Sequence, residues 1–356
     1  MTYAPRIERS FELVGLPAEI FGRPRGVAVA TPIDGLALLA LGDAPASAPR
    51  WSALPDGNRS AILVAPRVGY AGREWLVSVK GVGALSPMYG ESLPDRRIHG
   101  ESWMGEAPFG AQGELGARTA LGITERWAAG ELRGAEICPL TAVVIVPDRA
   151  VDRASFWVRR HRGPVLAEQR LVPSDVRVFH GGSRTLGRTP EEALAAFGVE
   201  AVPALDAFVD RYLQTGIALL TLAARSARTV HGERVGLDFD DAWLDKDAVV
   251  APDGTLTFAD LETLEERPLT PARITRQIGR NHYELFATLD VLLDIRDAWA
   301  GTSTTREARR ASLITRIELA LAHDPIARPR VSDEGLDLDV TPPGGAPTRV
   351  RLVDRR

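Results

Sequence analysis

Residues 73–81 are Arg73-Glu-Trp-Leu-Val-Ser-Val-Lys80-Gly81, an alternation of polar and apolar side chains that stops at a glycine. This pattern predicts a β-strand that carries Lys80 near its end. The chain has two lysines, Lys80 and Lys246, so 41 of its 43 Lys and Arg residues are arginines. Because lysine is a compact point charge and arginine a broad planar fork, a lysine kept against this bias indicates a position that arginine does not fit. Lys80 is therefore the first candidate for a functional residue.

Further strands are predicted on both sides of this segment. They correspond to short apolar runs punctuated by Gly, Pro, Asp and Asn, at 26–31, 36–41, 60–66, 141–147 and 165–179. Residues 114–129 favour a helix. Residues 81–113 are rich in Gly, Pro, Ser and Met without a sustained period, which predicts a long loop of the kind that is usually functional or mobile.

The second half of the chain has helical patterns. Thr189-Pro-Glu-Glu is typical of a helix start, and apolar residues at helical spacing predict helices at 203–230, 271–300 and 304–323. Pro252-Asp253-Gly254 predicts a hairpin turn between two short strands. The expected fold is α+β and bilobal: a strand-rich N-lobe over 1–178, a helical C-lobe over 179–330, and a C-terminal tail over 331–356 that is β or irregular.

Composition narrows the class of protein. The 356 residues carry a formal net charge of −4, a single Cys, and 45% hydrophobic residues. One Cys excludes a disulfide framework and a multi-thiolate metal site. The mildly acidic balance argues against a nucleic-acid partner, and no apolar run reaches the length of a membrane span. These features predict a soluble, cytoplasmic protein that binds neither nucleic acid nor membrane.

The candidate chemistry lies in charged residues at defined places. Lys80 on a strand and Glu114 at the start of the next helix match the pairing of a kinase-like fold, in which the lysine holds phosphates and a helix carboxylate holds the lysine. Glu106 is the alternative to Glu114 as the carboxylate that pairs with Lys80. Asp247 and Asp260 lie 13 residues apart across the expected hairpin and are suited to bind one Mg²⁺ through oxygen.

Three segments of the chain form recognisable motifs: Trp75-Leu-Val-Ser-Val-Lys80-Gly-Val-Gly-Ala84, Asp56-Gly-Asn-Arg59-Ser-Ala-Ile-Leu63 and Gly163-Pro-Val-Leu-Ala-Glu-Gln-Arg170-Leu-Val-Pro-Ser-Asp-Val-Arg177. They resemble segments of the selenoprotein O family of kinase-like protein adenylyltransferases. The most specific match is the pair of arginines seven residues apart with Pro-Ser between them. With the segment around Asp260, the resemblance spans four patches within residues 55–260.

The resemblance implies a Mg²⁺-dependent enzyme that binds ATP between its lobes in a flipped orientation and transfers AMP to a hydroxyl of an unidentified protein or small-molecule acceptor. Lys80 would then hold phosphate and Glu114 would pair with it. The outer phosphates would be held by the arginines Arg59, Arg170 and Arg177, and the metal by Asp247 and Asp260. Arginine forks suit a phosphate that must be held still rather than transferred.

The chain departs from the family at the general base. The family's Asp-Asn pair is replaced by Asp245-Lys246-Asp247, so Asp245 is the first candidate for the base and Asp241 the second, while Lys246 is suited to neutralise a phosphate. Glu262 is a spare metal ligand. Two alternatives stay open: a kinase that transfers the γ-phosphate to a small molecule or protein, and a catalytically inactive ATP-binding pseudokinase module.

Overall fold

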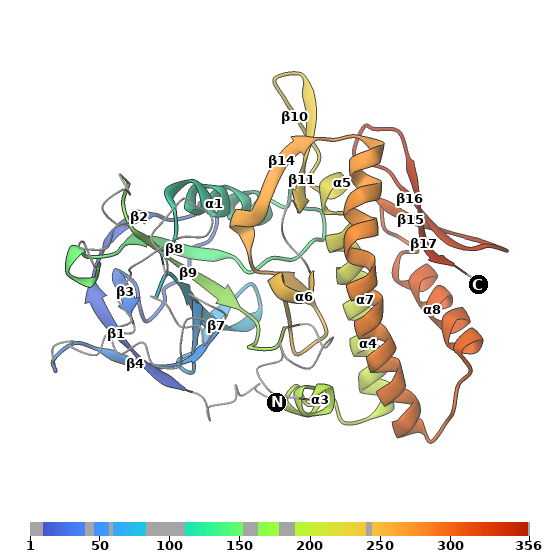
Figure 1. The fold of residues 1–356 in the computed structure, drawn as a ribbon, viewed down its shortest axis with the longest axis horizontal. Coiled ribbons are helices and arrows are strands. Elements are labelled where there is room, and N and C mark those ends of the chain that lie inside the picture. Colours follow the sequence, from blue (N-terminus) through green and yellow to red (C-terminus); the bar gives the residue numbers. More distant parts are fainter. Residues whose placement is uncertain are drawn as a thin grey trace. The chain divides into compact units, whose positions relative to one another are not determined.

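The computed structural model describes residues 10–39, 46–56, 60–82, 111–151, 163–177, 189–239 and 244–354 (Figure 1). The chain divides into two compact units, each with its own core. We call the first the β-rich unit, which comprises Pro5–Ala129 and Cys138–Asp175. The second, the helical unit, comprises Gly130–Ile137 and Val176–Arg356, together with the first four residues. The protein is therefore a mixed α+β protein with a strand-rich part and a helix-rich part.

Within the described residues of the β-rich unit, nine strands form one antiparallel sheet in the order β2-β8-β9-β7-β5-β4-β1-β3, with β6 paired to β7. The strands are β1 (Phe11–Pro17), β2 (Glu19–Gly22), β3 (Leu36–Leu39), β4 (Arg50–Pro55), β5 (Ser60–Leu63), β6 (Val68–Tyr70), β7 (Arg73–Lys80), β8 (Leu140–Ile145) and β9 (Leu166–Val172). Helix α1 (Glu114–Ala128) packs against β8 and β9, and the short helix η3 (Asp148–Ala150) follows β8.

The alternation in β7 has a direct structural cause. Trp75, Val77 and Val79 enter one apolar cluster with Leu171 of β9. Because successive side chains of a strand point to opposite faces, Ser78 and Lys80 lie on the other face. The strand predicted from residues 73–81 is confirmed. The helix predicted over 114–129 is α1, and strands β8 and β9 correspond to the predicted runs 141–147 and 165–179.

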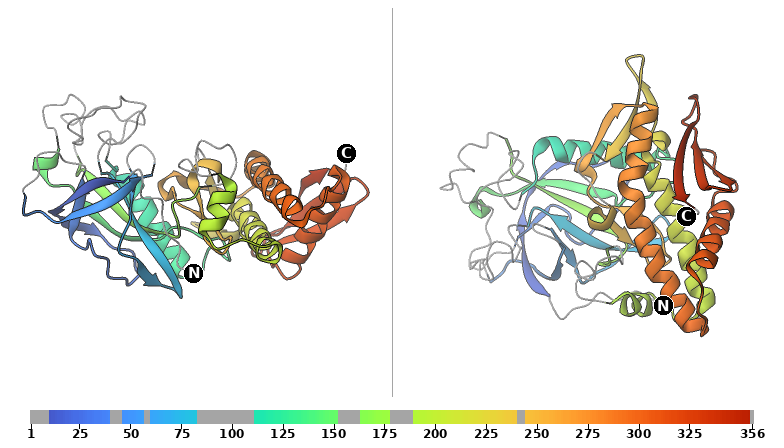
Figure 2. Two further views of the ribbon diagram at one scale, coloured as in Figure 1. Left: turned by 90° about the horizontal axis from the view of Figure 1, so that it is seen from below. Right: turned by 45° about the vertical axis from the view of Figure 1, so that its right-hand side comes forward.

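The helical unit is built around long helices that lie side by side (Figure 2). Its helices are α3 (Pro190–Ala196), α4 (Val202–Leu220), α5 (Leu222–Arg225), α6 (Leu244–Asp247), α7 (Pro271–Ala300) and α8 (Arg306–Ala320), with the short helix η4 (Leu261–Thr263). Helix α4 packs against α7 and α8, and its buried face carries Phe208, Tyr212 and Ile217.

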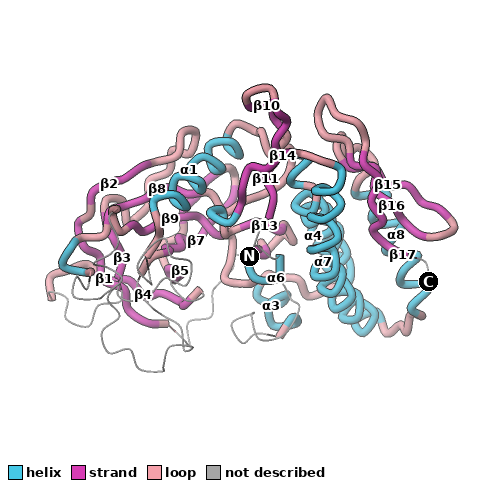
Figure 3. The backbone as a smooth tube through the Cα atoms, turned by 45° about the horizontal axis from the view of Figure 1, so that its top comes forward, coloured by secondary structure: helices cyan, strands magenta, loops and turns pink. Residues whose placement is uncertain are grey.

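Three small antiparallel sheets complete the helical unit (Figure 3). Their strands are β10 (Arg228–Val230), β11 (Glu233–Phe239) and β14 (Leu264–Pro268); β12 (Ala248–Val250) and β13 (Leu256–Phe258); and β15 (Ala327–Ser332), β16 (Gly335–Val340) and β17 (Thr348–Asp354). The last sheet buries Leu336, Leu338 and Val340 and packs against α7 and α8. The residues expected to form a β or irregular tail are therefore a regular sheet.

Two local predictions are wrong. The run 26–31 forms no strand, because it lies between a turn at Gly26 (φ +83°) and Pro32, whose ring cannot donate a ladder hydrogen bond. The helix expected over 203–230 ends at Leu220, is followed by α5, and gives way to β10. There, His231 (φ +50°) and Gly232 (φ +83°) form the tight turn to β11, which takes the chain into a hairpin.

Candidate functional site

Lys80 is the last residue of β7 and is only 5% exposed. Its Cα lies opposite Ser60 of β5 and Glu168 of β9, so it occupies the interior of the sheet. The following residue, Gly81, has φ +97°, and a Cβ there would lie 2.8 Å from the carbonyl oxygen of Leu166. Only glycine permits the chain to leave the sheet directly after Lys80 at this distance from β9.

Arg170 lies on β9, on the same face of the sheet as Lys80. The Cα of Arg170 lies opposite that of Ser78 on β7, and cross-strand partners have their side chains on the same face. Ser78 and Lys80 are two residues apart on β7, so they also share that face. The guanidinium is 2.6 Å from the Glu168 carboxylate, and both side chains are at least nine-tenths buried. A lysine, an arginine and a carboxylate thus lie together on two neighbouring strands.

Glu168 is the residue of this group that sequence reasoning missed. It lies within Leu-Ala-Glu-Gln-Arg-Leu-Val, a strand that is buried along its whole length, and its three consecutive polar residues do not indicate this burial. Its Oε2 accepts from Arg170, while its buried Oε1 has no hydrogen-bond partner among the described residues. The buried hydroxyl of Ser78 also lacks a partner there. Unpartnered buried polar atoms on one face indicate a place where a ligand or water binds.

Glu114 has a different setting from the one expected. Its carboxylate lies on the exposed first turn of α1, is 42% exposed, and pairs with Arg118 four residues later at 2.7 Å. Its negative charge at the helix N-terminus also interacts favourably with the helix dipole. The structure therefore places the Glu114 carboxylate in a surface ion pair, and the buried carboxylate on the face of Lys80 is Glu168.

Of the three arginines expected to hold phosphate, two are described, and they belong to different units. Arg59 lies outside the described residues. Arg170 belongs to the β-rich unit, whereas Arg177 belongs to the helical unit, where it pairs with Val249 of β12. The adjacent backbone hydrogen bond, from Val250 N to Val176 O, is 2.8 Å long. The strand expected over 165–179 ends at Val172, and Pro173 interrupts it.

Asp247 and Asp260 flank the open end of the hairpin β12–β13. Ala248 pairs with Phe258, and Ala259 N donates to Asp247 O at 2.7 Å, so the two strands bring the aspartates together although they are 13 residues apart. The turn between them needs Gly254, which has φ +86° and whose Cβ would lie 2.4 Å from the Phe208 carbonyl oxygen. Asp247 is 3% exposed and Asp260 is partly exposed.

Two carboxylates suit Mg²⁺, which uses one or two protein carboxylates and completes its six ligands with water and phosphate oxygens. In the described part of the chain, no group of three or more His, Cys, Asp or Glu side chains is arranged to hold a metal. The donor set therefore fits a metal ion that arrives with a phosphate ligand rather than a closed, all-protein site. Glu262, the spare ligand, lies in η4 directly after Asp260.

The first candidate for the general base, Asp245, lies in α6. Asp245 and Lys246 are in this helix, but their side chains are outside the described part, as are Asp241 and Glu106. The start of α6 is held by α7, because Leu244 N donates to the buried Asn281 Oδ1 at 3.3 Å. Of the long loop expected over 81–113, residues 83–110 are not described.

Polar residues of α7 position β11, a role that sequence reasoning did not assign. Asp238 is 2% exposed and pairs with Arg273 at 2.5 Å and Arg276 at 3.3 Å. Gln277, buried one turn on, accepts from Ala223 N and donates to Leu237 O. The helical periodicity of α7 predicts a buried face but does not show that these polar residues belong to it.

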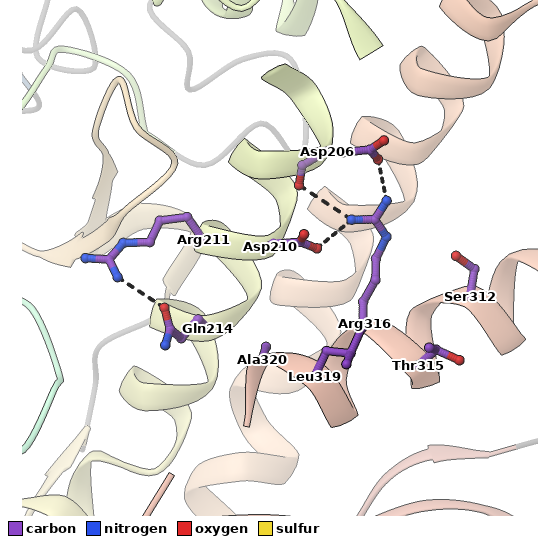
Figure 4. Close-up of a pocket in the computed structure, with 9 residues that line it drawn as sticks. All are labelled: Asp206, Asp210, Arg211, Gln214, Ser312, Thr315, Arg316, Leu319 and Ala320. Carbon is purple, nitrogen blue, oxygen red and sulfur yellow. Dashed lines mark hydrogen bonds and ion pairs between the residues drawn. The ribbon is translucent and has the colours of Figure 1, made fainter. Parts of the chain in front are cut away.

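A separate groove lies between α4 and α8 (Figure 4). It contains none of the predicted site residues. Arg316 contacts Asp206 and Asp210, and Arg296 reaches Asp206 at 2.7 Å. Burial raises the pKa of Asp206, but hydrogen bonds and charges from Arg296 and Arg316 outweigh it and hold this pKa below its usual range. The groove is thus lined by a surface network of ion pairs, which links α4 to α8 through Arg316.

No protein-family model matches the chain, and no curated protein matches it. The resemblance to selenoprotein O therefore depends on the quoted segments alone. Of the helices in the described part of the chain, none is long and apolar enough to cross a membrane.

Proposed function

We propose that this protein is a Mg²⁺- and ATP-dependent nucleotidyltransferase of kinase-like fold that transfers AMP to a hydroxyl of an acceptor, most simply a protein side chain. The observation that carries the proposal is the buried pair of cations, Lys80 and Arg170, on one face of neighbouring strands. Lysine ammonium and arginine guanidinium groups are the side chains that bind phosphate oxygens most strongly, and on these strands they lie beside the Glu168 carboxylate, which pairs with Arg170 at 2.6 Å.

The second support is the hairpin. Asp247 and Asp260 at its open end are hard oxygen donors of the kind that hold Mg²⁺ with nucleotide phosphates. A bound Mg²⁺ neutralises phosphate charge that develops during transfer. Within the helical unit, the proposal assigns metal binding to these two aspartates.

The reaction is a displacement at phosphorus. The acceptor oxygen forms a bond to the α-phosphorus, the bond from that phosphorus to the bridging oxygen breaks, and pyrophosphate leaves. The hydroxyl proton passes to a carboxylate, with Asp245 the first candidate and Asp241 the second. Lys80 and the arginines stabilise the charge on the leaving pyrophosphate, so catalysis is positioning and electrostatics.

A kinase reaction is the second candidate. The aspartates across the hairpin have the spacing used to hold Mg²⁺ in kinases, and this arrangement does not depend on which phosphate is transferred. What favours AMP transfer is the buried Arg170, since an arginine fork holds a terminal phosphate in place instead of releasing it.

Parallel labelling reactions test the proposal. The full-length protein is incubated with Mg²⁺, a cell lysate as acceptor source, and ATP labelled at either the α- or the γ-phosphate. Label transferred from the α-position alone, and lost in Lys80→Met and Asp260→Asn, supports AMP transfer. Arg349→Met, which removes an exposed ion pair with Asp339 in the last sheet, is the matched control and should label normally.

Transfer from the γ-position alone would establish the kinase instead. Binding of ATP, measured by equilibrium dialysis, with no transfer of either label would support the inactive nucleotide-binding module. Absence of both binding and transfer would refute all three forms of the proposal.

A further inference from the structure

Glu168 forms a buried ion pair with Arg170. Its side chain is 1% exposed, and its partner Arg170 is 7% exposed. One carboxylate oxygen accepts from Arg170 at 2.6 Å, while the other, Oε1, has no hydrogen-bond partner in the part of the chain that the structure describes. A buried acceptor left unsatisfied destabilises the fold, because it has lost its hydrogen bonds to water without replacing them. The arrangement is therefore complete only when a donor reaches Oε1.

The position of Glu168 limits what that donor is. Its Cα lies opposite Lys80 on β7, and cross-strand partners present their side chains on the same face about 5 Å apart. The next residue on that face of β7 is Ser78, opposite Arg170. The helix carboxylate Glu114 is occupied by Arg118 on the surface. Glu168 is thus the carboxylate that the sheet itself places beside both cations.

We infer that Glu168 is a positioning residue, which holds the Arg170 guanidinium with one carboxylate oxygen and the Lys80 ammonium with the other when a nucleotide polyphosphate binds. This inference rests on the proposed function. Glu168 does not touch the phosphates, since like charges repel; it orients the two cations that do. A carboxylate on the neighbouring strand thereby performs the role that the family resemblance assigned to the helix residue Glu114.

If Glu168 is a positioning residue, replacing it should affect the affinity for ATP and kcat differently. Glu168→Gln keeps the shape and an acceptor for Arg170 but removes a negative charge beside the phosphates. Affinity for ATP should stay the same or increase, because a repulsion is lost, while kcat should fall about 10- to 100-fold because the cations are no longer held in the reactive geometry. A purely structural role would instead weaken ATP binding and lower the melting temperature together.

The experiment measures two quantities on the full-length protein. Equilibrium dialysis gives the Kd for ATP in the absence of acceptor, and transfer of α-label gives kcat and KM. Glu125→Gln is the matched control, since Glu125 lies in the same unit and pairs with Arg25 at 3.3 Å. Glu168→Asp is the second variant: it keeps the charge, shortens the side chain, and should bind ATP within about twofold of wild type while losing kcat.

The outcomes separate this inference from the proposed function. If the wild-type protein binds ATP and transfers α-label, and Glu168→Gln keeps its kcat or binds ATP more weakly, Glu168 has no positioning role and the inference is wrong. If Glu168→Gln does not fold, an unchanged kcat in Glu168→Asp overturns the inference in the same way. If wild type transfers no α-label, the proposed function fails, and the inference fails with it.

Discussion

Replacement of Arg225 by Met should destabilise the helical unit strongly. This guanidinium is 2% exposed and donates to Arg133 O at 2.6 Å, to Thr221 Oγ1 at 2.8 Å and to Asp324 Oδ2 at 2.5 Å. Asp324 is 14% exposed and also accepts from two backbone N–H groups. Methionine fills much of the volume but removes the guanidinium that donates to the Arg133 carbonyl and to the mostly buried Asp324 carboxylate.

The expected loss follows from these contacts. Removing one partner of a buried ion pair costs about 3–5 kcal/mol. Because Asp324 retains its backbone donors and some solvent, we expect the lower end, about 3 kcal/mol. In a domain of 150–250 residues each kcal/mol lowers the melting temperature by about 2–4 °C, so the decrease should be about 6–12 °C.

Differential scanning calorimetry of the full-length protein measures this change. Arg228→Met is the matched control, because the same substitution there removes a two-pronged pair with Glu266 in which Arg228 is 45% exposed. Surface pairs contribute about 0.2–1 kcal/mol, so the control should lower the melting temperature by no more than about 4 °C. If the two variants lowered the melting temperature equally, the buried ion pair of Arg225 would contribute no more stability than the exposed pair of Arg228.

Two further predictions concern the same unit. Gly254→Ala should cost clearly more than Gly301→Ala: both have positive φ, but a Cβ at Gly254 would lie 2.4 Å from the Phe208 carbonyl, whereas no described atom lies within 4 Å of one at Gly301. The strain at Gly301 alone is about 1 kcal/mol, and urea midpoints that coincide for the two variants would contradict the steric argument. Asp206 should stabilise the fold above about pH 4, and this contribution should vanish as pH falls through its lowered folded-state pKa. The difference in melting temperature between wild type and Asp206→Asn should therefore be constant near pH 7 and shrink progressively as pH falls below about 4, and a difference that does not change with pH would exclude the ion pairs as its source.

Local patterns predicted the elements that carry most of the candidate site. The alternation before Lys80 predicted β7, and the turn Pro252-Asp253-Gly254 predicted the hairpin that brings Asp247 and Asp260 together. These predictions succeed because strand alternation and turn chemistry depend on a few adjacent residues. The hairpin also needs no distant partner to set the separation of its two ends.

Which charged residues come together depends on partners far along the chain. The arginines Arg170 and Arg177 are seven residues apart, yet they join different units, because the chain leaves β9 at Val172 and pairs next with the hairpin. Glu114 and Glu168 are each a single acidic residue in an element that could bring its carboxylate close to Lys80. Which of them is buried beside Lys80 depends on the pairing of β7 with β9, strands separated by more than 80 residues.

The sequence by itself determined the mixed α+β character, the strand that ends at Lys80 and the hairpin between the two aspartates, since these follow from side-chain period and turn residues. Only the tertiary structure decided which charges are buried and with what they pair: Glu168 with Arg170, Asp238 with Arg273, and Arg225 with Asp324. The physical reason is that the cost of a buried charge is set by the surroundings that the whole fold creates, and these come from segments that no local pattern relates.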